Sequence, residues 1–233
     1  MKLYPLSPTS KSAVNIGKIS RKFRLKILTP EHTPLAGIIV LADGTPDDYV
    51  VALLSYRLNG EKVLGVVKPE EKRLGVFSII PTILNVLREG KIAVLIDQEN
   101  EDLNTIFSEV SRRLSGIGTI IRDIVKEERL WVYKCEHSIK KFQLIVIVNG
   151  LSEYTFKKHS IEDHLLKAAE KLLKVKIDEE DPKEGWSKLR DRQDEVFRQL
   201  KDAKNLDDIF PQQIKGLKLL HNNPSFSQLY YSP

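Results

Sequence analysis

The stretch Lys91-Ile-Ala-Val-Leu-Ile-Asp-Gln-Glu99 joins a short apolar run directly to two carboxylates. A continuous apolar run of this length is typical of a strand that is buried on both faces of a parallel sheet. Gly37–Ala42 and Phe142–Val148 have the same character, and acidic or small polar residues follow each of them. Ligands of open α/β sheets bind beyond the carboxyl ends of the strands. A functional site is therefore expected where these three runs end.

Strands and helices alternate along the rest of this region. Further strands are expected over Val63–Val67, Thr119–Ile124 and Leu130–Cys135. Helices are expected over Asp48–Leu58 and over Phe77–Arg88, the second with an interruption near Pro81. A third, amphipathic helix is expected to include Leu103 and to end at Leu114. Ser160 and Asp163 approximate a capping box, and the helix that they begin is expected to run through Leu173. The alternation predicts an α/β fold with a mostly parallel central sheet flanked by helices, as in Rossmann-like proteins.

The composition changes on both sides of this region. Residues 1–36 are rich in Pro, Ser, Thr and Lys and are predicted to form an N-terminal extension, with an edge strand over Lys22–Leu28. Residues 37–176 are predicted to form the α/β domain. Residues 177–233 are predicted to form a helical C-terminal extension, because Trp186–Ala203 is highly charged and has apolar residues at helical spacing.

The overall composition narrows the class of protein. Hydrophobic residues make up 41% of the 233 residues, which is enough for a core, and the absence of an apolar run of membrane-spanning length argues against a membrane protein. Cys135 is the only cysteine, which excludes a disulfide within the chain and indicates a reducing, cytoplasmic environment. Few Met and Cys beside many Lys, Glu and Ile resemble the composition of thermophile proteins. The net charge of +5 is compatible with a nucleic-acid partner but does not establish one.

Acidic residues at the strand ends suggest a metal site. Asp97 and Glu99 could share a hard cation such as Mg²⁺, with water and a substrate phosphate completing its coordination, and such a cation would suit phosphoryl transfer. The simpler alternative is that acidic residues after a strand cap the next helix, as expected for Asp47, Asp48, Glu101 and Asp102. Other catalytic templates are absent from the sequence, including the phosphate-binding loop, the dinucleotide fingerprint and the nucleophile elbow.

Three segments resemble the Toprim domain of primases, topoisomerases and overcoming-lysogenization-defect nucleases. Leu41–Leu54 is similar to the opening segment of that family, in which a Glu-Gly pair precedes an acidic helix start. Ala93–Glu99 is similar to its Asp-x-Asp strand. Ile161-Glu162-Asp163-His164-Leu165-Leu166 resembles the helix start of small stand-alone Toprim-related proteins. The resemblance covers residues 37–173 and leaves both ends of the chain outside it.

The resemblance implies a divalent metal, Mg²⁺ or Mn²⁺, held by Asp43, Asp97 and Glu99. Asp43 would bind metal or move protons, and Glu162 could join the ligands. The sequence departs from the family at two positions, since Asp43 stands where the family has Glu and Glu99 where it has Asp. Each swap moves a carboxylate by about 1.5 Å, and a misplacement of about 1 Å can cost about 10²-fold in rate.

The implied activity is metal-dependent phosphodiester cleavage in nucleic acid. The alternative is a degenerate, non-catalytic Toprim-like module for nucleic-acid binding or assembly, and a third possibility is a flavodoxin-like or Rossmann-like small-molecule domain. Lys157, Lys158 and His159 precede the last helix of the resemblance and could hold a phosphate backbone, or they could be an ordinary solvated charge run. The sequence does not distinguish a DNA substrate from an RNA substrate, and it predicts no particular oligomeric state.

Overall fold

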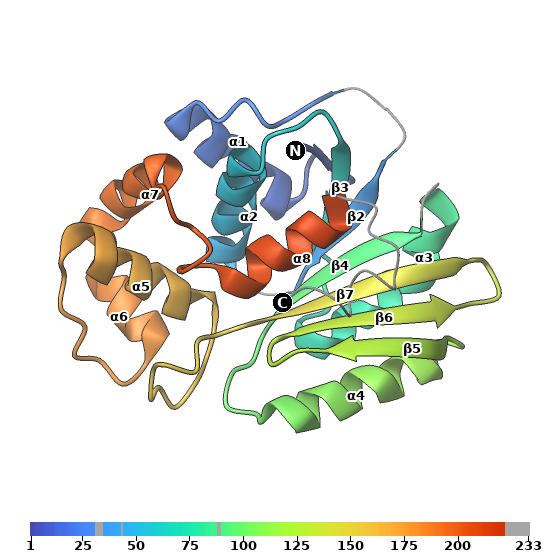
Figure 1. The fold of residues 1–233 in the computed structure, drawn as a ribbon. Coiled ribbons are helices and arrows are strands. Elements are labelled where there is room, and N and C mark those ends of the chain that lie inside the picture. Colours follow the sequence, from blue (N-terminus) through green and yellow to red (C-terminus); the bar gives the residue numbers. More distant parts are fainter. Residues whose placement is uncertain (31–34, 43, 88–89, 222–233) are drawn as a thin grey trace.

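The computed structural model describes residues 1–30, 35–42, 44–87 and 90–221 (Figure 1). Its centre is a seven-stranded sheet with the order β1-β3-β2-β4-β7-β6-β5. The strands are β1 (Lys2–Pro5), β2 (Gly37–Leu41), β3 (Val63–Val67), β4 (Lys91–Asp97), β5 (Ile120–Lys126), β6 (Leu130–Glu136) and β7 (Lys141–Asn149). The pairs from β1 to β7 are all parallel, and β6 is antiparallel to both of its neighbours. The predicted α/β fold with a mostly parallel sheet is confirmed.

Helices cover both faces of the sheet (Figure 1). One face carries α1 (Lys11–Phe23), α2 (Thr45–Arg57), α5 (Ile161–Leu173), α6 (Pro182–Lys188), α7 (Gln193–Asp202) and α8 (Pro211–His221). The opposite face carries the 3-10 helix η1 (Arg73–Ile79), α3 (Ile80–Val86) and α4 (Leu103–Gly116). A second 3-10 turn, η2 (Arg190–Arg192), lies between α6 and α7. No helix within the described ranges is long and apolar enough to span a membrane.

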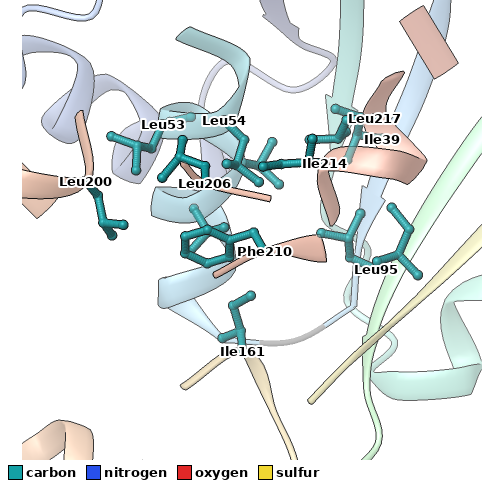
Figure 2. Close-up of a cluster of buried hydrophobic side chains, with 14 of the residues drawn as sticks. Ile39, Leu53, Leu54, Leu95, Ile161, Leu200, Leu206, Phe210, Ile214 and Leu217 are labelled. Atoms are coloured by element: carbon teal, nitrogen blue, oxygen red, sulfur yellow. The ribbon is translucent and has the colours of Figure 1, made fainter. Parts of the chain in front are cut away.

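Burial on both faces explains the continuous apolar runs of the inner strands. In β4, Ala93 and Leu95 belong to the cluster on the α8 side, whereas Val94 and Ile96 belong to the cluster on the α4 side. Figure 2 shows the first cluster, where Phe210 lies between side chains from the sheet and from α2, α5, α7 and α8. The C-terminal helices therefore share one core with the central strands.

The N-terminal region differs from the prediction. The strand expected over Lys22–Leu28 is wrong, because α1 continues to Phe23 and Leu28 makes only an isolated bridge to Leu3. Ile16, Ile19 and Phe23 are buried at helical spacing, and this amphipathic period decides the local structure. The region does supply an edge strand, but that strand is β1, which pairs with β3.

The helical region expected over Phe77–Arg88 begins earlier than predicted, at Arg73, and its first part is a 3-10 helix, which is wound more tightly than an α-helix. Residues 73–79 form η1, and α3 begins at Ile80. Pro81 lies in the first turn of α3, where a missing N–H has no helical partner to lose. It therefore starts this helix instead of interrupting it. Arg88 lies outside the described residues.

Candidate metal site

The carboxyl ends of β4 and β7 meet in register, and a buried polar network joins them. Asp97 ends β4 and is paired with Asn149, which ends β7. The Asn149 side-chain amide donates to Asp97 Oδ1 over 3.0 Å and to Asp47 Oδ1 over 2.9 Å. Asp47 lies in the first turn of α2, the helix that follows β2. The ends of three adjacent strands are thus connected, as the sequence predicted, although the described link to β2 is made by Asp47. Asp43 lies outside the described residues.

The carboxylate of Asp97 has a fixed orientation. Its Oδ1 also accepts from the backbone N–H of Ile161 over 3.1 Å, at the start of α5. A helix N-terminus stabilises a negative charge in this position. The other oxygen, Oδ2, lies 4.0 Å from the Lys183 ammonium nitrogen. Asp97 therefore presents a buried carboxylate whose second oxygen faces a cation.

Glu99 is held in a left-handed backbone conformation, with a φ of 57°. This conformation costs about 1–2 kcal/mol in a residue with a side chain. Two backbone hydrogen bonds with His159 maintain it, one from Glu99 N to His159 O over 2.7 Å and the reverse one over 2.9 Å. The Glu99 Oε1 atom lies 2.5 Å from Lys183 Nζ. The strained turn thus brings the second acidic residue to the same ammonium group as Asp97.

Glu162, in the first turn of α5, is the third carboxylate near this ammonium group. The residue is only 8% exposed, and its Oε2 has no hydrogen-bond partner among the described residues. Burial is the main reason that the pKa of Glu162 is raised, and the positive charge of Lys183 works in the opposite direction. A buried carboxylate oxygen without a partner is costly, and binding a cation would satisfy it.

Lys183 reaches the acidic edge from the first turn of α6. Asp181 caps this helix by accepting from the backbone N–H groups of Lys183 and Glu184, and Pro182 follows the cap. Burial works to lower the pKa of Lys183, but its hydrogen bond to Glu99 and the nearby charges of Asp97, Glu99 and Glu162 outweigh burial and raise it. The side chain is therefore a permanent cation among carboxylates from β4, the following turn and α5.

The donor set fits a hard divalent cation in chemistry but is not assembled as a metal site. Carboxylate oxygens are the ligands that Mg²⁺ and Mn²⁺ prefer. Within the described part of the chain, however, no group of three or more His, Cys, Asp or Glu side chains is arranged to hold a metal ion. The carboxylates of Asp97 and Glu99 converge on the ammonium group of Lys183 instead.

The basic residues predicted to contact nucleic acid lie in the loop before α5, next to this edge. Lys157 is exposed and pairs with Glu180, and Lys158 is exposed. His159 is largely buried, and its Nδ1 lies 2.6 Å from Asp163 Oδ2. The two lysines are therefore accessible from solvent, whereas His159 is engaged inside the protein.

Asp163 does not join the cation site. Its carboxylate accepts from the backbone N–H groups of Ser160 over 3.1 Å and Leu151 over 3.0 Å, in addition to its contact with His159. The hydrogen bond to Ser160 is part of the capping box that the sequence predicts. Asp163 thus orders the loop and the start of α5, the turn that also carries Glu162.

A second buried network fixes α8 beside the site. His164 is fully buried, and burial is the main reason that its pKa is lowered to about 4. Its Nε2 lies 3.0 Å from the side-chain amide nitrogens of both Gln212 and Gln213, and its Nδ1 lies 2.6 Å from Ile209 O. Gln213 also donates to Asn149 Oδ1 over 2.9 Å. The neutral imidazole therefore has a structural role, because it connects α5 to α8.

Sequence reasoning located part of this site and missed its cation. Asp97, Glu99 and Glu162 could be found because acidic residues follow apolar strands or begin a helix. The only local signal at Lys183 is Asp181-Pro182, which predicts a helix start and says nothing about what the helix packs against. No family model, curated protein or solved structure matches this chain.

Proposed function

We propose that this chain is a Toprim-like protein that binds Mg²⁺ or Mn²⁺ at the carboxyl edge of its sheet and hydrolyses phosphodiester bonds in nucleic acid. One observation carries the proposal: Asp97 and Glu99 approach the same ammonium group, and the buried carboxylate of Glu162 interacts with its charge. An edge that draws one cation among three carboxylates is suited to holding another.

Each residue has a separate part in the proposed reaction. Asp97 and Glu99 would bind the metal directly, and Glu162 would complete the anionic surroundings. Asp43 would bind metal or transfer protons, as the family resemblance implies. The bound metal would polarise a phosphoryl oxygen and lower the pKa of water. Asn149 would keep the Asp97 carboxylate in place through its amide hydrogen bond.

The proposed substrate is a polynucleotide. The chain has a net charge of +5, and Lys157 and Lys158 lie exposed in the loop next to α6. Lysine side chains in such a loop can neutralise phosphate groups, which is the main source of affinity that does not depend on sequence. A cytoplasmic place of action is part of the proposal, because a single cysteine, Cys135, leaves no disulfide within the chain.

A second candidate function is a non-catalytic nucleic-acid-binding or assembly module. The position of Lys183 favours it, because a permanent ammonium group can neutralise the acidic edge without any metal. In that case the carboxylates stabilise the attachment of α6 to the sheet.

A nuclease assay tests the first function. Purified protein is expected to cleave fluorescent single-stranded DNA, double-stranded DNA or RNA with Mg²⁺ or Mn²⁺ and not with EDTA. Asp97→Asn keeps Oδ1 as an acceptor for Ile161 and should lower the rate at least ~10²-fold, the scale of losing one group that stabilises the transition state. Glu99→Gln should act in the same way without unfolding the protein.

The control variant is Asp178→Asn, which removes an exposed carboxylate that pairs with Lys176 on the surface. Its cleavage rate should equal that of the wild type. If the wild type cleaves none of the three substrates with either metal, the nuclease proposal is wrong. Metal-independent, salt-sensitive binding of the same polynucleotides would then support the second candidate.

A further inference from the structure

Lys183 is the one described cation that lies between Asp97 and Glu99, and it arrives from the C-terminal region. We propose that Lys183 is a built-in competitor for the divalent cation, so that its side chain must leave the acidic edge before a metal binds there. The identity of the metal rests on the proposed function. The competition itself rests on the position of the ammonium group.

The charges require an exchange and not joint occupancy. Three carboxylates at a largely buried edge need a compensating cation, because an uncompensated buried charge is strongly unfavourable. Lys183 supplies a compensating cation at this edge. A divalent ion bound to Asp97 and Glu99 would lie within a few ångströms of the ammonium group, where like charges repel each other.

The surroundings of Lys183 would also allow its side chain to leave the acidic edge toward solvent. Its side chain is 45% exposed, so the ammonium group is open to solvent on one side. The segment before α6 is attached to the loop that carries Lys157 and Lys158. Lys157 N donates to Glu180 O, and the side chains of the same two residues form an ion pair. Release of Lys183 would therefore free its own side chain first, while Asp181 still caps α6.

Manganese binding to the full-length chain tests this inference. Free Mn²⁺ is measured by electron paramagnetic resonance during titration of the wild type, Lys183→Gln and Lys188→Gln. Lys188 belongs to the same helix but pairs with Glu179 and Glu184. Lys183→Gln should bind Mn²⁺ about tenfold more tightly than the wild type, the change produced by a free-energy difference of about 1.4 kcal/mol. Lys188→Gln should bind like the wild type.

Thermal unfolding gives an independent readout. Without metal, Lys183→Gln should melt at a lower temperature than the wild type, since the carboxylates lose their counter-ion. Saturating Mn²⁺ should then raise its melting temperature more than that of the wild type, because a ligand of the native state stabilises in proportion to its affinity. Adding Glu99→Gln to Lys183→Gln should abolish the gain in affinity, which places the extra binding at this edge.

The outcomes separate the two proposals. Equal Mn²⁺ affinity in the wild type and Lys183→Gln would overturn the competition and leave the proposed metal site standing. Tighter binding that persists in the double variant would also overturn it, because the metal would lie elsewhere. No Mn²⁺ binding in either protein would overturn both the competition and the proposed metal-dependent function.

Discussion

Gly150, directly after β7, shows how closely the backbone is packed around the candidate site. Its φ is 131°, a conformation that residues with a side chain rarely adopt. A Cβ atom here would lie 2.6 Å from His159 Cβ and 2.9 Å from an Arg129 guanidinium nitrogen. Its backbone N–H donates to His164 Nε2 over 3.3 Å, and its carbonyl accepts from Gln212 over 2.9 Å. Both the conformation and the close approach therefore require glycine.

We expect Gly150→Ala to lower the free energy of unfolding by about 2–5 kcal/mol, the sum of backbone strain and overpacking. Urea denaturation followed by circular dichroism measures the loss. Gly17→Ala is the matched control, because Gly17 lies within α1 and a Cβ there meets nothing within 4 Å. That change should be neutral or stabilising by up to about 1 kcal/mol. Similar effects of the two variants would contradict the argument.

At the scale of single residues, the sequence predicts which side chains carry charge at the acidic edge better than it predicts which residues they contact. Asp97 and Glu162 could be predicted because each begins or ends an element whose pattern is readable. The contact between Lys183 and Glu99 joins residues that are 84 positions apart. Such a contact depends on the docking of α6, which no local pattern specifies. The contact between His159 and Asp163 is local, since the two residues are four positions apart, but the sequence alone does not show whether the His159 ring faces this carboxylate or a ligand.

At the scale of elements, α8 covers the centre of the sheet, although the sequence predicted only a helical extension there. The helix begins at the carboxyl edge, where the buried side chains of Gln212 and Gln213 donate hydrogen bonds to the end of β7. Further along, Gly216 lies so close to β7 that a Cβ would come within 2.5 Å of Ile147 Cδ1. Polar residues on the buried face weaken the amphipathic pattern of α8, which is why its location is difficult to predict.

Leu217→Ala tests whether α8 is part of the core. Leu217 is fully buried between α8 and the sheet, so the truncation should cost about 2–5 kcal/mol in the free energy of unfolding. The neighbouring Lys218 is half exposed and pairs with Asp207 at the surface. Lys218→Ala should change stability by less than about 0.5 kcal/mol. Chemical denaturation compares the two, and a loss below about 1 kcal/mol for Leu217→Ala would show that α8 packs loosely.

The strands were more predictable than the helices. Continuous apolar runs place β2, β4 and β7 to within one or two residues, because burial on both faces leaves few polar positions between their ends. In contrast, α1 contains Ser12, Asn15 and Ser20 among its buried residues. Ser12 and Asn15 donate to the buried carboxylate of Asp48. The buried face of α1 therefore mixes polar with apolar residues, so its pattern is harder to recognise in the sequence than an unbroken apolar run.

At the scale of the whole molecule, the terminal regions and the central sheet share one hydrophobic cluster. Met1 and Ile16 from the N-terminal region belong to it, together with Phe210 and Leu217 from the C-terminal region and Leu95 from β4 (Figure 2). The Met1 ammonium group also donates to Ser55 O in α2 over 2.9 Å. The regions 1–36 and 177–233 were predicted as extensions from their composition, which reports polarity but not long-range packing.

A fragment containing only residues 37–176 should therefore fail to fold. Without α1, α7 and α8 the apolar side chains of β2, β4 and β7 on one face would meet water, and each buried aliphatic residue contributes about 1.5–3 kcal/mol. The full chain should unfold in a single cooperative thermal transition, whereas the fragment should bind a hydrophobic dye and show no cooperative melting. A cooperative transition in the fragment would instead establish residues 37–176 as an independent domain. The terminal regions would then be separable from the sheet, and Lys183 would reach the acidic edge from a segment that docks without stabilising the fold.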